Sequence, residues 1–247
     1  MERKFMKRQI LKLDNIKELQ KGIYSMTLAG DCSEVNTPGQ FVNIQLDGFY
    51  LRRPISIYSY DENHITLVFK VVGEGTKALA KAVKGDTFDV LLPLGNGFDP
   101  EKGGDNPLLV GGGIGVPPLY GLAEDLVNRG ITPQVVIGFN SEKEVILTDE
   151  FRAIGIEPVI TTVDGSVGAK GFVTDAMKTL DYDYVYTCGP EPMLKAVYDA
   201  APDGQFSFEA RMACGFGACM GCSCETKYGY KRICKDGPIL FREEIKW

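Results

Sequence analysis

Histidine is almost absent from this sequence, whose one histidine is His64. A Ser-His-Asp arrangement needs a histidine that accepts a proton near neutral pH. His64 begins the alternating stretch "HITLVF", which is typical of a half-exposed strand residue rather than of a catalytic base. No paired carboxylates replace it, so we predict that the chain contains no acid–base catalytic residue.

Positive charge and long apolar runs are also scarce. The chain has 27 Lys and Arg against 33 Asp and Glu, and its net charge of -6 argues against nucleic acid as a partner. No run of about eighteen uncharged apolar residues is present, so no membrane-spanning helix is predicted. The basic "RKFMKR" near the N-terminus is not followed by an apolar run, which argues against a signal peptide. A cytoplasmic protein with reduced thiols is therefore expected.

Residues 1–101 are predicted to form a six-stranded antiparallel β-barrel. Short β-branched or aromatic stretches recur about every ten residues between Gly, Pro, Asn and Asp, and a short helix is expected at residues 76–84. The expected strands cover residues 7–16, 22–30, 39–46, 52–61, 64–73 and 86–95.

Residues 102–208 follow a different pattern, after a Gly-, Asp- and Pro-rich segment at residues 96–107. Strands and helices now alternate, which predicts a parallel sheet covered by helices. Residues 209–247 remain as a small third unit. The expected strands cover residues 108–112, 133–139, 157–165 and 182–189, and the expected helices 117–130, 147–155, 171–180 and 191–201.

Cysteine, by contrast, is abundant near the C-terminus. The spacing C-x4-C-x2-C, with a fourth cysteine further on, is that of plant-type [2Fe–2S] ferredoxins. Intervening glycines permit a tight loop and let backbone N–H groups approach the cluster sulfurs. The predicted ligands of the cluster are Cys214, Cys219, Cys222 and Cys234.

Other interpretations of the cysteines remain open. Zinc usually requires two paired knuckles, and only one pair is convincing here. Unligated thiols are a further alternative, whereas disulfides are disfavoured by the compartment and by the odd number of cysteines. Cys224 is interpreted as a free thiol near the cluster rather than as a fifth ligand.

Two turns in the alternating region are typical of a nucleotide site. Glycines of "GGGIGVPP" let the backbone approach a pyrophosphate at a helix N-terminus, and "CGPEPM" follows a later strand at the same edge of the sheet. A small buried residue is an equally good interpretation of Cys188. The segment "GFNSEKE" contains no arginine, which favours NAD over NADP. The predicted residues are Gly111, Gly112, Gly113, Gly115, Cys188, Gly189 and Pro190.

The barrel also contains a candidate anion site. Arg53 begins one strand, and a turn with Gly73, Gly75 and Thr76 follows the next strand and opens the short helix. An arginine and a helix-opening turn can bind a phosphate, and Ser56 can offer its hydroxyl to a heteroaromatic ring. A surface arginine beside an ordinary tight turn is the alternative interpretation.

The order of these motifs resembles the ferredoxin–NADP reductase superfamily, in which an FAD-binding barrel precedes a pyridine-nucleotide domain. With "RRPISI", "PLGNGF", "KDGP" and the C-terminal cysteines, the whole chain resembles the electron-transfer subunits of class B dihydroorotate dehydrogenase. The resemblance implies that Ser56 faces the flavin ring and that Ile55 replaces the aromatic residue many superfamily members carry there. The residues implied to bind FAD are Arg53, Pro54, Ile55, Ser56, Lys70, Gly73, Gly75 and Thr76.

The resemblance also implies a function. A partner subunit with FMN would oxidise dihydroorotate in pyrimidine biosynthesis, and electrons would pass through the [2Fe–2S] cluster and FAD to NAD⁺, in a heterotetramer of two plus two subunits. The alternative is a flavin and iron–sulfur reductase subunit, linked to NAD(P)H, that serves a ferredoxin, a hydrogenase or an oxygenase. A redox-sensing regulator would be non-enzymatic, but no effector segment is evident. Glu209 is interpreted as a solvated carboxylate, with a role beside the flavin or nucleotide as the alternative.

Overall fold

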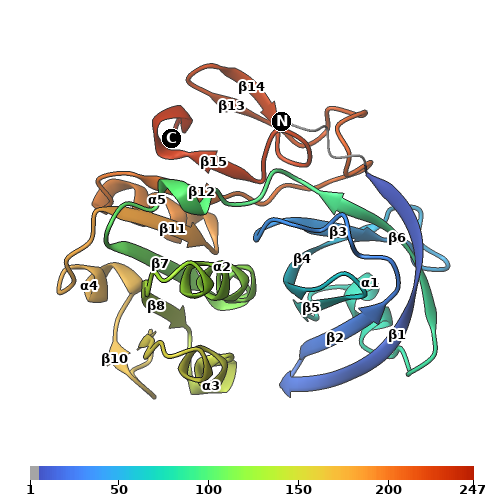
Figure 1. The fold of residues 1–247 in the computed structure, drawn as a ribbon, viewed down its shortest axis with the longest axis horizontal. Helices are drawn as coiled ribbons and strands as arrows, with labels where there is room; N and C mark the ends of the chain where they lie inside the picture. The colour runs from blue at the N-terminus through green and yellow to red at the C-terminus, as the bar shows by residue number, and fades with distance from the viewer. Residues whose placement is uncertain (1–5) are drawn as a thin grey trace.

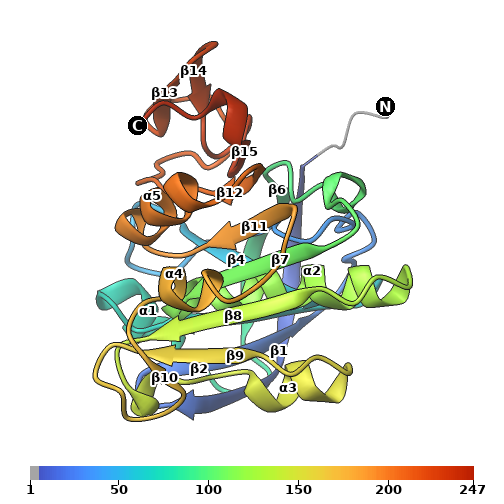
Figure 2. The same cartoon turned by 90° about the vertical axis from the view of Figure 1, so that its left-hand side faces the viewer.

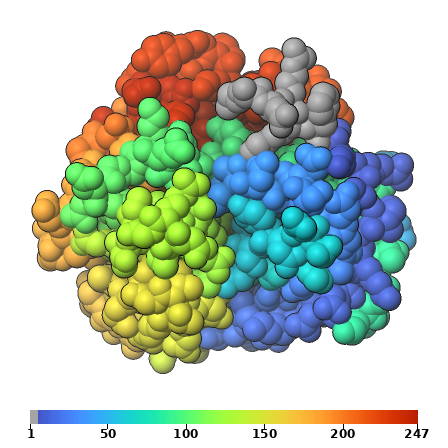
Figure 3. Space-filling view, in the orientation of Figure 1, coloured from blue at the N-terminus to red at the C-terminus, as the bar shows by residue number. Residues whose placement is uncertain are grey.

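The chain folds into a barrel, a helix-covered sheet and a C-terminal segment, residues 209–247, that contacts both (Figure 1). The computed structural model describes residues 6–247, so residues 1–5 of the predicted barrel unit lie outside the described part. In the space-filling view of Figure 3, the C-terminal segment (red) lies across the top of the molecule. Within residues 6–247, no helix is long and apolar enough to cross a membrane.

The predicted six-stranded antiparallel barrel is confirmed, and it closes in the order β1-β2-β5-β4-β3-β6. Alternate side chains, such as Leu28, Val42 and Ile44, fill its interior and are fully buried. The strands are β1 (Lys7–Gln20), β2 (Ile23–Ala29), β3 (Phe41–Ile44), β4 (Arg53–Tyr60), β5 (His64–Lys70) and β6 (Thr87–Leu94).

The short helix after β5 differs from the predicted range, residues 76–84. Helix α1 covers Glu74–Leu79, because the Thr76 hydroxyl accepts a hydrogen bond from the Gly73 N–H (3.2 Å) and donates one to its C=O (3.1 Å). This contact starts the helix two residues earlier than predicted. Its expected last residues form turns instead, one of which is closed by the Asp86 carboxylate.

The second part is a seven-stranded sheet in the order β10-β9-β8-β7-β11-β12-β15. All neighbouring strands are parallel except β12 and β15, which are antiparallel. The strands are β7 (Pro107–Gly112), β8 (Gln134–Phe139), β9 (Val159–Thr162), β10 (Ala169–Lys170), β11 (Tyr184–Cys188), β12 (Gly204–Ser207) and β15 (Ile239–Phe241).

Helices cover both faces of this sheet, as the alternation predicted. Leu109 packs on the face covered by α2 and α3, whereas Leu108 and Val110 pack on the face covered by α4 and α5. The helices are α2 (Val116–Asn128), α3 (Thr148–Ala153), α4 (Val173–Met177) and α5 (Glu191–Ala200). Short 3₁₀ turns are η1 (Pro100–Lys102), η2 (Gly113–Gly115), η3 (Glu142–Glu144) and η4 (Arg242–Glu244).

Strands β10 and β12 and the strands of the C-terminal segment were not predicted from the sequence. These strands have two to four residues each, which is too short for a periodic pattern. Strand β15 joins the edge of the sheet, so the C-terminal segment shares a sheet with the preceding domain. Earlier in the same segment, β13 (Ser223–Thr226) and β14 (Gly229–Arg232) form a hairpin at the top of the molecule (Figure 2).

Helix α2 also packs against the barrel and fixes the two domains relative to each other. Tyr58 of β4 and Tyr120 of α2 stack with their ring centroids 4.8 Å apart. A β-carbon at Gly121 would lie 2.8 Å from the Tyr58 carbonyl oxygen, so the close approach requires glycine. The glycine-rich turn that precedes α2 is therefore held next to the barrel.

Candidate functional site

The cysteine loop, residues 214–222, and the nearby Cys234 bring the four predicted cluster ligands together as two pairs. The side chains of Cys214 and Cys219 interact with each other, and so do those of Cys222 and Cys234. Cys222 and Cys234 are buried, Cys214 is half-buried and Cys219 is exposed. Two pairs of thiols match a cluster in which four thiolates are shared between two irons.

Backbone N–H groups point at these sulfurs. Cys219 N–H donates to Cys214 Sγ (3.4 Å), and Cys234 N–H donates to Cys222 Sγ (3.4 Å). Burial raises the pKa of the Cys214 thiol, but the backbone donors outweigh burial and lower this pKa to about 6. Donors aimed at sulfur stabilise the thiolate form that ligates iron, so these residues fit a [2Fe–2S] cluster.

Within residues 6–247, no three His, Cys, Asp or Glu side chains converge on one metal-ion position. A two-iron cluster does not need such a point, because its thiolates are spread over two irons. Cys224 lies in β13 and packs against the same apolar cluster as Cys222 and Cys234, and its interpretation as a free thiol stays a prediction.

The loop is fastened to the hairpin behind it. Gly215 and Gly217 adopt φ values of +78° and +88°, which favour glycine. The carbonyl oxygen of Gly217 accepts a hydrogen bond from the Arg232 guanidinium (3.0 Å), which also pairs with Asp236 (2.8 Å). The shape of the loop therefore depends on the contact between Gly217 and Arg232 of β14.

In the barrel, Arg53 lies directly against the glycine turn that was predicted to act with it. A β-carbon at Gly75 would overlap the Arg53 guanidinium. This guanidinium donates to the Leu51 carbonyl oxygen (2.5 Å) and lies 4.6 Å from the centre of the Phe49 ring. Within residues 6–247, no carboxylate pairs with Arg53, so its charge is free for an anion such as a pyrophosphate.

The other residues implied for FAD have different surroundings. By strand alternation, Pro54 and Ser56 lie on the outer face of β4, whereas Ile55 packs against the barrel core. The Thr76 hydroxyl is used within its own turn. Lys70 Nζ pairs with a carboxylate of the sheet domain at 2.7 Å. The contacts of these residues with a flavin stay predictions.

The two predicted nucleotide-binding turns are adjacent in space. Strands β7 and β11 are neighbours, and Gly111 lies opposite Cys188. A β-carbon at Gly115 would overlap the Cys188 carbonyl group, and one at Gly112 or Gly189 would overlap the Met193 side chain. Glycines therefore allow the turns to approach each other closely.

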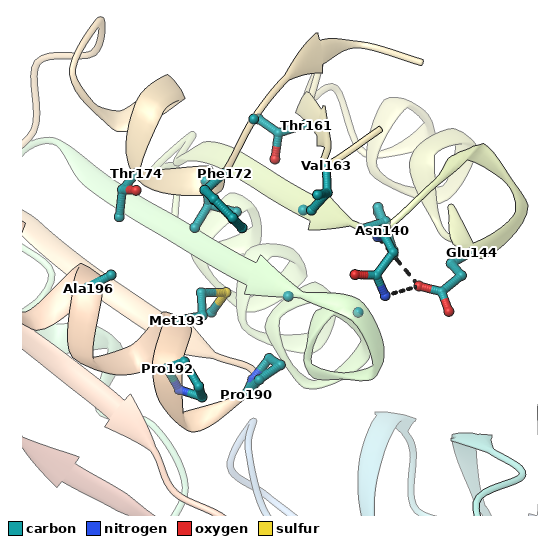
Figure 4. A pocket seen from close by; sticks show the side chains of 16 residues that line it. Asn140, Glu144, Thr161, Val163, Phe172, Thr174, Pro190, Pro192, Met193 and Ala196 are labelled. Atoms are coloured by element: carbon teal, nitrogen blue, oxygen red, sulfur yellow. Dashed lines mark hydrogen bonds between the residues drawn. The ribbon is translucent and has the colours of Figure 1, made fainter. Parts of the chain in front are cut away.

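Beside these turns lies a pocket of about 450 Å³ (Figure 4). Gly112, Gly113 and Pro190 line it, together with residues that the sequence analysis missed, such as Phe172 and Thr161. Thr161 is 1% exposed, and its hydroxyl has no hydrogen-bond partner among the described residues.

One side of the pocket is acidic. Asn140 and Glu144 follow β8 and lie opposite Thr174 and Ala196 (Figure 4). The Glu144 carboxylate accepts hydrogen bonds from Lys70 Nζ (2.7 Å) and Asn140 Nδ2 (2.8 Å), and the bond from Lys70 is the main cause that lowers the pKa of Glu144. Glu144 is therefore ionised at neutral pH. An acidic residue after the second strand was a signal that the sequence analysis could have used.

Cys188 and Glu209 lie near each other at the end of β11. Burial raises the pKa of Cys188 to about 12, and the nearby Glu209 contributes to this shift. Cys188 is therefore a neutral thiol at physiological pH. Glu209 stays accessible to solvent, but desolvation by the surrounding protein raises its pKa. The exposed position agrees with the predicted solvated carboxylate, and a role beside the flavin or nucleotide stays a prediction.

Comparison with known proteins gives consistent matches. Residues 209–246 match the family model described as the iron-sulfur cluster binding domain of dihydroorotate dehydrogenase B. The electron transfer subunit of dihydroorotate dehydrogenase B (NAD(+)) from Fusobacterium nucleatum is 48% identical over 93% of this chain and 95% of the relative. The subunit of the same name from Bacillus pumilus is 44% identical over 97% and 98%.

Solved structures share the fold. A structure of an NADH-dependent reduced ferredoxin-NADP oxidoreductase is 31% identical, with a TM-score of 0.88 over 96% of this chain and 90% of the other. Phthalate dioxygenase reductase is 22% identical and has a TM-score of 0.65 over 78% and 63%, which supports the fold alone.

Proposed function

The chain belongs to the family of electron transfer subunits of dihydroorotate dehydrogenase B, and from this premise we propose that it carries electrons from a dihydroorotate-oxidising FMN subunit to NAD⁺. We assign the carriers as a [2Fe–2S] cluster and FAD. When bound, the cluster transfers single electrons and the flavin couples them to hydride transfer. The protein's part is to bind these groups, to hold them in order and to select the nucleotide.

The cysteine loop carries this proposal. Cys214 and Cys219 form one pair of ligands, and Cys222 and Cys234 form the other. A backbone N–H group that already points at the Cys214 sulfur stabilises its thiolate before any metal binds. The exposed position of Cys219 leaves one edge of the loop accessible to a partner subunit.

The barrel would hold FAD through the uncompensated charge of Arg53 and the backbone of the turn at Gly73 and Gly75. A guanidinium next to a backbone without side chains is suited to a pyrophosphate. Ser56, on the outer face of β4, would face the flavin ring. Cys188 and Glu209 would lie beside the reacting rings, where a neutral thiol adds no charge.

NAD would bind in the pocket beside Gly112 and Gly113. The Glu144 carboxylate at one side of this pocket is suited to accept hydrogen bonds from the hydroxyls of a ribose. It would repel a 2′-phosphate. This favours NAD over NADP, in agreement with the absence of arginine from the segment after β8.

We extend the proposal to the assembly and the units of the chain. The partner is the FMN-containing catalytic subunit, in a complex of two plus two subunits in the cytoplasm. The units are a flavin barrel up to residue 101, a nucleotide domain at 102–208 and a cluster unit at 209–247. The pairing of β15 with β12 would anchor the cluster unit on the nucleotide domain.

Anaerobic purification with the catalytic subunit tests the function. We expect flavin and [2Fe–2S] absorbance bands, iron and sulfide in equal amounts, and dihydroorotate-dependent formation of NADH. Zinc in place of iron, or material without a yellow flavin, would refute the relay. The similarity to a ferredoxin-NADP oxidoreductase structure favours a ferredoxin-linked reductase as the second candidate. Activity with reduced ferredoxin and none with dihydroorotate would establish that alternative.

A further inference from the structure

Asn43 is a buried amide on the outside of the barrel. It lies in β3 between Val42 and Ile44, whose side chains fill the barrel interior. Strand alternation therefore directs Asn43 to the outer face. Its exposure is nevertheless only 1%, because the cysteine loop covers it.

The Asn43 side chain contacts the loop at the first cluster ligand. Asn43 Nδ2 donates a hydrogen bond to the Cys214 carbonyl oxygen at 3.2 Å. The amide also lies so close to Gly215 that a β-carbon there would overlap Nδ2. Gly215 has φ +78°, so both its backbone angle and its contact with Asn43 require glycine.

The same face of the barrel contains residues proposed to bind the flavin. Asn43 lies directly opposite Pro54 in the pairing of β3 with β4, and Phe41 lies opposite Ser56. Phe41 packs in the same apolar cluster as Cys222 and Cys234. One surface of two paired strands therefore meets both the cysteine loop and the proposed flavin site.

An apolar residue would fill this position at lower cost if packing were its only purpose. Asn43 Oδ1 is buried and has no hydrogen-bond partner among the described residues, which is unfavourable for the folded protein. The N–H group of the amide makes the contact that an apolar residue could not make, because it binds the backbone of a predicted ligand cysteine.

We propose that Asn43 is a positioning residue that holds the cysteine loop against the flavin-binding strands and so sets the separation of cluster and flavin. The inference rests on the proposed function, because it requires both groups in one chain. Asn43 touches neither the sulfur atoms nor the flavin ring by this proposal. It acts through the Cys214 backbone.

The test compares two variants of the full chain loaded with flavin and cluster. Asn43→Leu keeps the branched shape and the number of side-chain heavy atoms and removes the donor. Asn96→Ala is the matched control, because Asn96 also ties the barrel to the C-terminal segment, at Ile239 (2.8 Å), but does not contact the cysteine loop. NADH reduces the flavin in a stopped-flow instrument, and the later reduction of the cluster is followed by absorbance and by freeze-quench EPR.

We expect Asn43→Leu to leave flavin reduction by NADH unchanged and to slow the reduction of the cluster, with the iron content of the wild type. Independently of turnover, amide hydrogen exchange at residues 214–217 should become about tenfold faster, as expected for one lost hydrogen bond. Asn96→Ala should change neither the cluster step nor this exchange. If Asn43→Leu does not fold, Gly215→Ala disturbs the same contact from the loop side.

Two results would overturn the inference. One is an Asn43→Leu protein with wild-type loop exchange and wild-type cluster reduction, and the other is an equal loss in both variants, which would indicate general destabilisation. A failure of the proposed function would look different, since wild-type material would then lack flavin or cluster. Hydrogen exchange of the chain as purified would still test the contact between Asn43 and Cys214.

Discussion

The sheet domain and the C-terminal segment achieve order by different means. In the sheet, side chains such as Leu109, Val136 and Val185 are fully buried between two layers of helices. The C-terminal segment instead exposes Phe216 and Met220 on the cysteine loop, and its own regular structure consists of short strands and one short 3₁₀ turn.

The two regions obtain their stability from different contacts. The sheet domain supplies most of the side chains of two buried apolar clusters, to which the C-terminal segment adds residues such as Ile239 and Leu240. The C-terminal segment relies on its expected metal ligands and on contacts with its neighbours, including β15 at the sheet edge and Asn96 at the barrel. Metal binding to such a segment contributes directly to its folding.

The largest expected effect comes from removing a buried cluster ligand. Cys222→Ser should abolish iron and sulfide binding and all dihydroorotate-dependent NADH formation, because a serine replaces a thiolate in a buried pair. The thermal transition of the sheet domain should persist. Cys224→Ser is the matched control and should retain the cluster. Iron analysis decides the outcome, and wild-type iron in Cys222→Ser would contradict the ligand assignment.

The stability of the sheet domain should be lowered by steric overlap between its turns rather than by loss of the metal. In Gly115→Ala, the new β-carbon overlaps the Cys188 backbone, and we expect a loss of about 1–3 kcal/mol in the free energy of unfolding. Denaturant titration at constant m-value measures it. Gly73→Ala is the control, because open space surrounds Gly73 and its φ is −170°. Equal midpoints for both variants would refute the close approach of the two turns.

A smaller effect is expected on nucleotide choice. Glu144→Gln removes the negative charge from the pocket, and we expect the preference for NAD⁺ over NADP⁺ to fall about tenfold, which corresponds to 1.4 kcal/mol. Steady-state kinetics with both nucleotides measure the ratio. Glu142→Gln, on the same 3₁₀ turn, should not change it. An unchanged preference in Glu144→Gln would exclude this carboxylate as the selecting group.

The smallest effect should come from the ion pair between the domains. Lys70 and Glu144 are 39% and 26% exposed, so Lys70→Gln should cost less than about 1 kcal/mol. The pKa of Glu144 is lowered in the folded protein, so the stabilisation is present above the unfolded pKa and is lost as the pH falls through the folded pKa. The stability difference should therefore vanish in acid. Lys77→Gln serves as the control, because it removes an exposed ion pair between Lys77 and Glu74 on α1.

Local patterns predicted most of the architecture. The barrel, the parallel sheet and the positions of the two glycine turns followed from periodicity and from turn residues. The range of α1 was wrong because the start of a short helix depends on one hydroxyl, that of Thr76, and not on periodicity. The position of Glu144 after the second strand was informative, but its place beside the pocket depends on contacts that form only in the folded chain.

The cysteine spacing, the glycine turns and the alternation of strands and helices can be read from the amino-acid sequence, since each depends on residues close together in the chain. The contact of Asn43 with Cys214, the ion pair of Lys70 with Glu144 and the addition of β15 to the sheet are seen only in the folded protein. These contacts join segments tens of residues apart or more. The periodicity of side chains along the chain does not indicate which surfaces come together, so these contacts are set by tertiary packing alone.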